Sequence, residues 1–524
     1  MTTHPAAVTL FLLTLLLSTP LQSDQIAELG SVEFSNSCAA NSQQPLNEAM
    51  AVLHSFWHDE AIRRFSQLVA ADPDCAMAYW GLAMSYAQIA WSRPSAKMLA
   101  LGRKAIDHAQ TLNNVTSRER GFLNAASEVF KESSDWQQRN EEQMARLHMA
   151  YSDDVEVSLF YVLSLLANLD AKDRTFSKQK LAGSIAEDVF AQHPNHPGAA
   201  HYIIHSYDYP PLAKQALPAA NYYADIAPSV PHALHMPTHI YSSLGMWQQS
   251  IAHNIRSREA AQRVDNAKAE AHALTYMLYA YMQQGADEQA LVQLNGIRNL
   301  AKNNPLNDGV TDHLAGAEAI YVLERQAWLE ATNIKLPPTV GESAVRAHAY
   351  VGGVRALSAA RAHDIPRAKQ EIANLKKLNE NPLAWSPDRV AIWIAVSSAW
   401  LSQAEGRQAE ALEHMARAVE LEQSSTFVGS MSSTSDVLIH VEEQRGDLLL
   451  ELARYKEALA AYELSLAASP SHLNSLYGAG RAAELAGRIQ LARLYFSKLL
   501  ELAAGDETNR AEFAHAQSVL SDSS

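Results

Sequence analysis

The sequence repeats one pattern at a spacing that limits the folds open to it. Residues 59–89 and 454–488 each contain an acidic residue followed by an alanine and an aliphatic residue, then an aromatic residue and a proline. These marker residues are Glu60, Phe65 and Pro73 in the first segment, and Glu457, Tyr462 and Pro470 in the second. Between these segments, 34 residues separate His201 from His235 and also His205 from His239. Helix pairs repeated at such a spacing bury their apolar faces by stacking on one another, which predicts an all-α superhelix.

These segments resemble tetratricopeptide repeats, and the next first-helix motif, Tyr79-Trp80-Gly81-Leu82, strengthens the resemblance. It covers nearly all of residues 41 to 510, and the whole chain is similar to a group of uncharacterised secreted bacterial repeat proteins. The resemblance implies a tetratricopeptide-repeat superhelix (α-solenoid). Its concave groove is expected to bind a peptide or a partner protein.

Two turn-rich breaks, 333–342 and 424–436, divide the predicted array. We therefore expect an N-terminal array over 41–332 that contains the histidine-rich groove, middle helices over 343–423 and a C-terminal pair of repeats over 436–510. Residues 1–23 are predicted to be a signal peptide.

The first residues contain an apolar run from Ala6 to about Leu17, which is short for a membrane span and is followed by small and polar residues. This pattern predicts export to a periplasmic or extracellular location, with no membrane span after signal removal. Because no lysine or arginine precedes the run, an uncleaved anchor is the alternative. Export would allow the two cysteines, Cys38 and Cys75, to form a disulfide. A thiolate metal site is the other interpretation.

The formal net charge is −15, and the sequence has no cluster of lysine and arginine. A nucleic-acid-binding protein needs a basic surface to neutralise phosphates. We therefore expect no nucleic-acid partner.

The repeat register implied by the resemblance places many histidines on the inner wall of the groove. Two neighbouring repeats contribute the central set, which consists of His201, His205 and Asp208 in one and His232, His235 and His239 in the next. Other repeats place further candidates on the same wall, namely His54, His272, His313, His440, Glu443 and Asp447.

Histidines four residues apart share one face of a helix, so each pair could bind one ion. We expect the pairs His201/His205 and His235/His239 to form a four-nitrogen site, or to supply three nitrogens with one open position. Imidazole ligands favour copper or zinc, and Asp208 would make iron possible. Neither pair contains the glutamate of the H-E-x-x-H motif, which argues against a zinc protease.

Three functions fit this pattern. The leading interpretation is an exported binding or assembly module with a polyhistidine transition-metal site. The first alternative is a metal-dependent enzyme, either a copper or iron oxidase or a hydrolase, that holds a small-molecule substrate at the metal; its catalytic residues cannot be named from sequence. The second alternative is a metal-free scaffold that binds peptides. Pro237 lies between the histidines of one pair, so it either kinks their helix or lies in the first turn of a helix that starts near His235.

Overall fold

The computed structural model describes residues 28–88, 93–170, 172–335, 341–380, 387–424, 439–503 and 510–521. The predicted signal peptide and nearly all of the 424–436 break lie outside these residues. Within them all regular secondary structure is helical, which confirms the predicted all-α fold. None of the described helices is long and apolar enough to cross a membrane.

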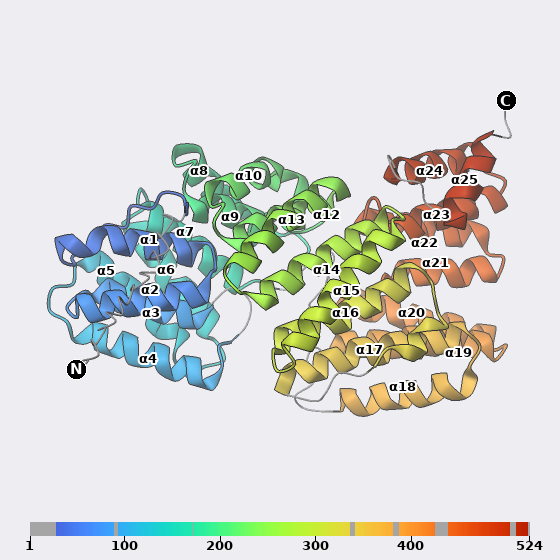
Figure 1. The fold of residues 1–524 in the computed structure, drawn as a ribbon, viewed down its shortest axis with the longest axis horizontal. Helices are drawn as coiled ribbons and strands as arrows, with labels where there is room; N and C mark the ends of the chain where they lie inside the picture. The colour runs from blue at the N-terminus through green and yellow to red at the C-terminus, as the bar shows by residue number, and fades with distance from the viewer. Residues whose placement is uncertain are drawn as a thin grey trace, which may run out of the picture.

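The helices form antiparallel hairpins that stack along the chain (Figure 1). The first five hairpins are α1 and α2 (Gln43–His54, His58–Ala71), α3 and α4 (Ala76–Ala87, Ala96–Thr111), α5 and α6 (Ser117–Val129, Trp136–Ala150), α7 and α8 (Val155–Ala167, Ser177–Gln192), and α9 and α10 (Pro197–Tyr207, Ala213–Ile226). The central helices are α11, α12 and α13 (Pro231–His235, Pro237–Ser243, Trp247–Arg263), α14 and α15 (Ala267–Gln283, Asp287–Asn303), and α16 (Asp308–Glu324).

The remaining helices are α17 and α18 (Gly341–Arg361, Ile365–Asn379), α19 and α20 (Pro387–Ala404, Gln408–Ser424), α21 and α22 (Val441–Glu451, Tyr455–Ala468), α23 and α24 (Leu473–Leu485, Ile489–Leu502), and α25 (Ala511–Ser521). Two short 3₁₀ helices are η1 (Ala40–Ser42) and η2 (Glu330–Asn333). The last helix, α25, begins one residue beyond the predicted C-terminal pair of repeats and packs on α24.

Successive hairpins approach closely because a glycine of one hairpin faces an aromatic ring of the hairpin before it. A Cβ atom on Gly81 would lie 2.2 Å from the Phe65 ring, and a Cβ atom on Gly478 would lie 2.3 Å from the Tyr462 ring. Both rings are buried. The aromatic residues that mark the repeat in the sequence are therefore the ones that fix the spacing between hairpins.

The turn between the two helices of a hairpin contains a residue with left-handed backbone geometry. Glycines fill this position in four turns, with φ between 70° and 78°, namely Gly245, Gly285, Gly406 and Gly487. In the first hairpin Phe56 takes the same geometry, with φ of 52°. A bulky residue is unfavourable at positive φ, so the surrounding structure must hold Phe56 in place.

The two cysteines form a disulfide that links η1 and the segment before it to the start of α3. The thiolate metal site is therefore wrong, because both sulfur atoms are used in the bond. The nearby Asp72 instead accepts hydrogen bonds from the Ala39 amide at 2.9 Å and the Ser42 hydroxyl at 2.7 Å.

The C-terminal hairpins fold back onto the centre of the array through a buried ionic cluster, which we call the C-terminal lock and define as His472, Glu324 and Glu443. His472 precedes α23, and its Nε2 lies 3.2 Å from a Glu324 carboxylate oxygen on α16. Its Nδ1 lies 2.8 Å from the Glu443 carboxylate on α21. All three side chains are buried.

Neighbouring contacts close the same interface. The Trp247 indole N–H donates to the Ser471 carbonyl at 3.1 Å, and the Leu473 amide donates to the Gln283 side chain at 2.9 Å. Because these partners are 190 or more residues apart in sequence, the array contains contacts beyond those between adjacent hairpins.

The lock holds a charged imidazole between two carboxylates. Burial opposes the charge on His472, but Glu324 and Glu443 outweigh it and raise the His472 pKa to about 10. Burial alone would raise the Glu324 pKa, but His472 lowers it to about 2. His440, the other titratable side chain beside His472, has its pKa lowered to about 4 by burial and by the His472 charge.

Replacing His472 with glutamine should destabilise the protein, because it leaves two buried carboxylates without a cation, at a cost of about 3–5 kcal/mol. A raised imidazole pKa contributes its full stability below the unfolded value near 6.5, and the contribution is lost as pH rises towards 10. The difference in unfolding free energy between wild type and His472→Gln should therefore shrink by about 1.4 kcal/mol per pH unit between pH 6.5 and 9. Urea unfolding across this range measures it. The exposed His108→Gln is the control, and a difference that does not change with pH would contradict the prediction.

Candidate metal centre

Four helices bring six histidines to one region of the inner wall. His201 and His205 lie on α9, His232 and His235 on α11, His239 on α12 and His272 on α14. Prolines start three of these helices, at Pro197, Pro231 and Pro237, where the missing N–H is tolerated because first-turn amides have no partner within the helix.

Pro237 divides the helix that carries the second histidine pair. Met236 lies between α11 and α12 with helical φ and ψ of −52° and −37°, so the chain continues in the same direction after an interruption. The chain is helical on both sides of this point, since α11 begins at Pro231 and α12 begins at Pro237, and the proline occupies the first turn of the second helix.

Three Nε2 atoms converge in what we call the first triad, defined as His235, His239 and His272. His235 Nε2 lies 3.1 Å from His239 Nε2 and 2.8 Å from His272 Nε2. Nitrogen ligands about 2.0–2.1 Å from zinc lie about 3.3 Å apart in a tetrahedral site. The three nitrogens therefore lie almost as far apart as one ion would hold them.

The opposite ring nitrogen of His235 is fixed by an amide. His235 Nδ1 lies 2.8 Å from Asn254 Oδ1, on α13. The Asn254 amide nitrogen donates to the Ser250 carbonyl at 2.9 Å, which orients the amide so that its oxygen faces the imidazole. An amide oxygen only accepts, so Nδ1 of His235 has the proton and Nε2 has a lone pair.

A carboxylate orients His239 in the same way. His239 Nδ1 lies 2.8 Å from Asp208 Oδ2, and Asp208 is buried just after α9. When Asp208 is ionised it only accepts, so Nδ1 of His239 also has the proton. Carboxylate or amide partners of this kind orient metal-binding imidazoles in many proteins. Asp208 was predicted as a direct ligand, but the structure places it behind His239.

Burial keeps these imidazoles neutral. It lowers the pKa of His235 well below the usual range, with the charge on His239 as the next cause. It lowers the pKa of His272 in the same way, with His235 as the next cause. Neutral imidazole is the form that binds metal ions. The Tyr276 hydroxyl lies 3.3 Å from His239 Nε2, so it could contact an additional ligand at the site.

The remaining central histidines form the second triad, defined as His201, His205 and His232. Their ligand nitrogens all lie within 4.8 Å of one another, as do those of the first triad. The sequence grouped His201 and His205 with His235 and His239, but the structure divides these pairs between two triads. His232 and His272 complete them.

Two of the other groove candidates lie beside the triads, namely His313 next to the first and His54, through its backbone carbonyl, next to the second. The His313 ring centroid is 4.8 Å from that of His272. His54 bonds to Glu156 and to the Tyr202 hydroxyl, each at 2.8 Å. Asp447 accepts hydrogen bonds from Arg361 and Tyr462.

His440 and Glu443 belong with the C-terminal lock, where the His440 and His472 ring centroids are 4.2 Å apart. These two residues therefore do not join the central histidines. They stabilise the return of the C-terminal hairpins onto α16.

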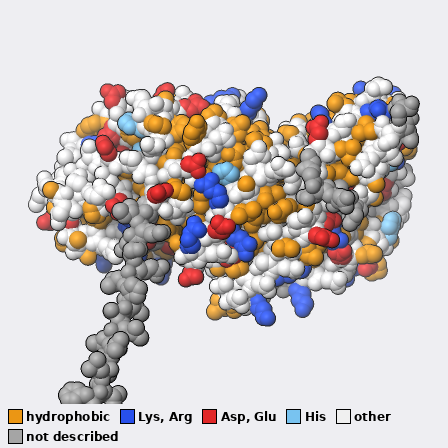
Figure 2. Space-filling model, turned by 45° about the horizontal axis from the view of Figure 1, so that its top comes forward, with side chains coloured by type: hydrophobic (Ala, Val, Ile, Leu, Met, Phe, Trp, Pro, Cys, Tyr) orange, Lys and Arg blue, Asp and Glu red, His pale blue; other side chains and the backbone are white. Residues whose placement is uncertain are grey.

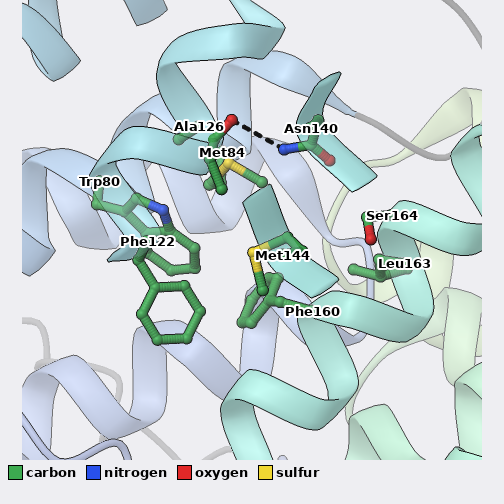
Figure 3. Close-up of a pocket in the computed structure, with 10 residues that line it drawn as sticks. Trp80, Met84, Phe122, Ala126, Asn140, Met144, Phe160, Leu163 and Ser164 are labelled. Atoms are coloured by element: carbon green, nitrogen blue, oxygen red, sulfur yellow. Dashed lines mark hydrogen bonds between the residues drawn. The ribbon is translucent and has the colours of Figure 1, made fainter. Parts of the chain in front are cut away.

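The methionines of the first repeats, Met77 and Met84, are part of the core. Met84 lies with Trp80, Phe122 and Phe160 around a cavity of about 10 Å³, roughly the space of one water molecule (Figure 3). Its polar lining includes Asn140, whose amide donates to the Ala125 carbonyl at 2.9 Å. These residues pack the first hairpins and hold no ligand-sized space.

Sequence reasoning missed several residues of these clusters, among them Asn254, His196 and His472. Asn254 lies on the second helix of its repeat, outside the register that predicts groove positions. His196 and His472 each follow a proline by two residues, in Pro194-Asn195-His196 and Pro470-Ser471-His472. Each histidine precedes a first helix and pairs with a buried glutamate, so this shared tripeptide was a usable signal.

Comparison with known proteins agrees with the fold. Residues 58–89 and 444–507 match the tetratricopeptide repeat family. No curated protein matches the chain. Among solved structures, the human IFIT1 dimer with m7Gppp-AAAA is 14% identical over 82% of this chain and 90% of that one, with a TM-score of 0.40. The human IFIT1 dimer with PPP-AAAA is 13% identical over 82% and 91%, with the same TM-score. At this similarity nothing about ligands transfers.

The stacked hairpins define an α-solenoid scaffold, a class of protein that serves in binding and assembly. Two parts of the chain, one near each end, match the tetratricopeptide repeat family. On the face seen in Figure 2, lysine and arginine are interspersed with aspartate and glutamate, and no large area has one sign of charge.

Proposed function

We propose that the protein is an exported tetratricopeptide-repeat module that binds a transition-metal ion at the first triad and uses the metal-bearing groove to hold a peptide or partner protein. One observation supports the metal above all others. With Asp208 ionised, the Nε2 lone pairs of His235 and His239 face each other 3.1 Å apart, and they repel unless a cation lies between them.

The ligand set favours zinc or copper, with iron as the next choice. Three neutral imidazoles suit these ions, whereas calcium, magnesium and manganese prefer oxygen ligands. Three protein nitrogens leave a coordination position for a ligand from outside the chain. The small exposure of His239, 9%, gives that ligand a route to the ion.

Protein purified without a histidine tag should contain at least one equivalent of zinc or copper per chain. The double variant His235→Ala/His239→Ala should lose one equivalent, because two of the three ligands are gone. Elemental analysis measures the content. The control His108→Ala/His193→Ala removes two exposed histidines instead, and should keep the wild-type content. Equal content in all three proteins would refute the site.

The carboxylate behind His239 should tune the affinity. Asp208→Asn keeps an oxygen that can accept from Nδ1 but loses the negative charge, so we expect zinc to bind about 10–100-fold more weakly. Competition with a chromophoric chelator measures this dissociation constant. Asp225→Asn on the neighbouring α10, where the aspartate is 73% exposed, should leave the affinity unchanged. Equal affinity of Asp208→Asn and wild type would show that Asp208 has no role.

Two features support export: the apolar run near the N-terminus and the Cys38–Cys75 disulfide, which is typical of oxidising compartments. Protein recovered from the cells that make it should therefore begin close to residue 24 and contain no free thiol. Mass spectrometry with thiol labelling measures both. An intact N-terminus together with two reduced cysteines would exclude export.

A further inference from the structure

We propose that the second triad, His201, His205 and His232, binds a second transition-metal ion beside the first. The proposed function depends on the first triad alone, and this inference shares with it only the class of ion. Three features of the second triad support this site: the positions of the imidazole protons, the atoms around the imidazoles and the placement of α11.

The three rings form a compact group contributed by two helices. His201 and His205 lie one turn apart on α9, with ring centroids 4.5 Å apart. The His232 ring on α11 lies 5.1 Å from that of His201 and 6.3 Å from that of His205. Each residue can supply one nitrogen to a point that all three share.

The proton of His201 can be placed. Its Nδ1 lies 2.6 Å from the backbone carbonyl oxygen of His54. A carbonyl only accepts, so Nδ1 has the proton and Nε2 has a lone pair. His201 is fully buried, and its Nε2 has no hydrogen-bond partner among the described residues.

His232 has a matching nitrogen. Its Nε2 atom is buried and also has no hydrogen-bond partner in the described part of the chain. Each buried acceptor without a donor costs about 1–3 kcal/mol. One cation bound by both nitrogens would remove the free-energy cost of both unpaired atoms. A single added proton cannot do so.

The other histidine clusters are built differently. Around Glu156 a carboxylate pairs with the imidazoles of His54 and His196, and in the C-terminal lock two carboxylates pair with the His472 imidazole. The second triad has no carboxylate among its ligand groups. It is therefore suited to an ion that prefers nitrogen, such as zinc or copper, and not to one that prefers oxygen.

Aromatic rings enclose the second triad. The Tyr223 ring stacks on His201, with centroids 5.0 Å apart and planes within 17°. The Phe56 ring lies 4.5 Å from the His201 ring and 5.5 Å from the His205 ring, measured between centroids. These rings limit the access of water to the ion. The unfavourable backbone geometry of Phe56 is explained by the position of its ring at this site.

The two triads are joined through α11, which supplies His232 to one and His235 to the other. The ring centroids of these two residues are 6.4 Å apart. Two dications bound in neighbouring triads repel each other, so the second ion should bind more weakly than the first. The pair would form a two-ion centre in the wall of the groove.

The test is the stoichiometry of Zn²⁺ binding to the full chain stripped with a chelator, measured by calorimetry and by elemental analysis after dialysis. Wild type should bind two ions in two steps. His201→Ala/His232→Ala should bind one, and His235→Ala/His239→Ala should also bind one. Circular dichroism checks that each variant is folded, and the single variant His232→Gln, at a partly exposed position, replaces the double variant if that one is not.

The outcomes separate the two hypotheses. One ion in wild type, kept by His201→Ala/His232→Ala and lost by His235→Ala/His239→Ala, would overturn the second site and leave the proposed function intact. One ion lost only with His201 and His232 would overturn the proposed first site. No binding in wild type would overturn both.

Discussion

Each hairpin of this protein can bury its apolar face only against its neighbours, and a glycine facing an aromatic ring sets how closely they approach. A Cβ at Gly81 would lie 2.2 Å from the Phe65 ring, so even a methyl group would push the hairpins apart. This spacing brings α9, α11, α12 and α14 near enough for imidazoles on different helices to share a point. The metal centre thus depends on contacts that contain no histidine.

The sequence predicts the fold and the equivalence of the histidine pairs, because both follow from a period. The 34-residue spacing places His201, His205, His235 and His239 at equivalent positions of neighbouring repeats, and in the structure all four side chains are buried. It does not predict their grouping. That depends on the division between α11 and α12 at Pro237 and on Asn254, which reaches His235 from the second helix of the repeat. Groove positions assigned from the first helix of each repeat include neither of these two features.

The partners of the C-terminal candidates are not predicted by the sequence for a related reason. His440 and Glu443 lie beside His472, and His472 pairs with Glu324 on α16. Where distant hairpins meet depends on small rotations added over many repeats, and a local pattern does not record these rotations. The Pro-x-His tripeptide before α9 and α23 shows that a local signal existed for the residues involved, although not for their partners.

The C-terminal lock changes the mechanics of the solenoid. A solenoid whose hairpins contact only their neighbours is elastic, and its superhelical pitch can lengthen or shorten to fit a bound ligand. Here buried charges attach α23 to α16. This contact closes the superhelix between these two helices and fixes its pitch there. A groove in a superhelix of fixed pitch cannot widen to bind a larger ligand.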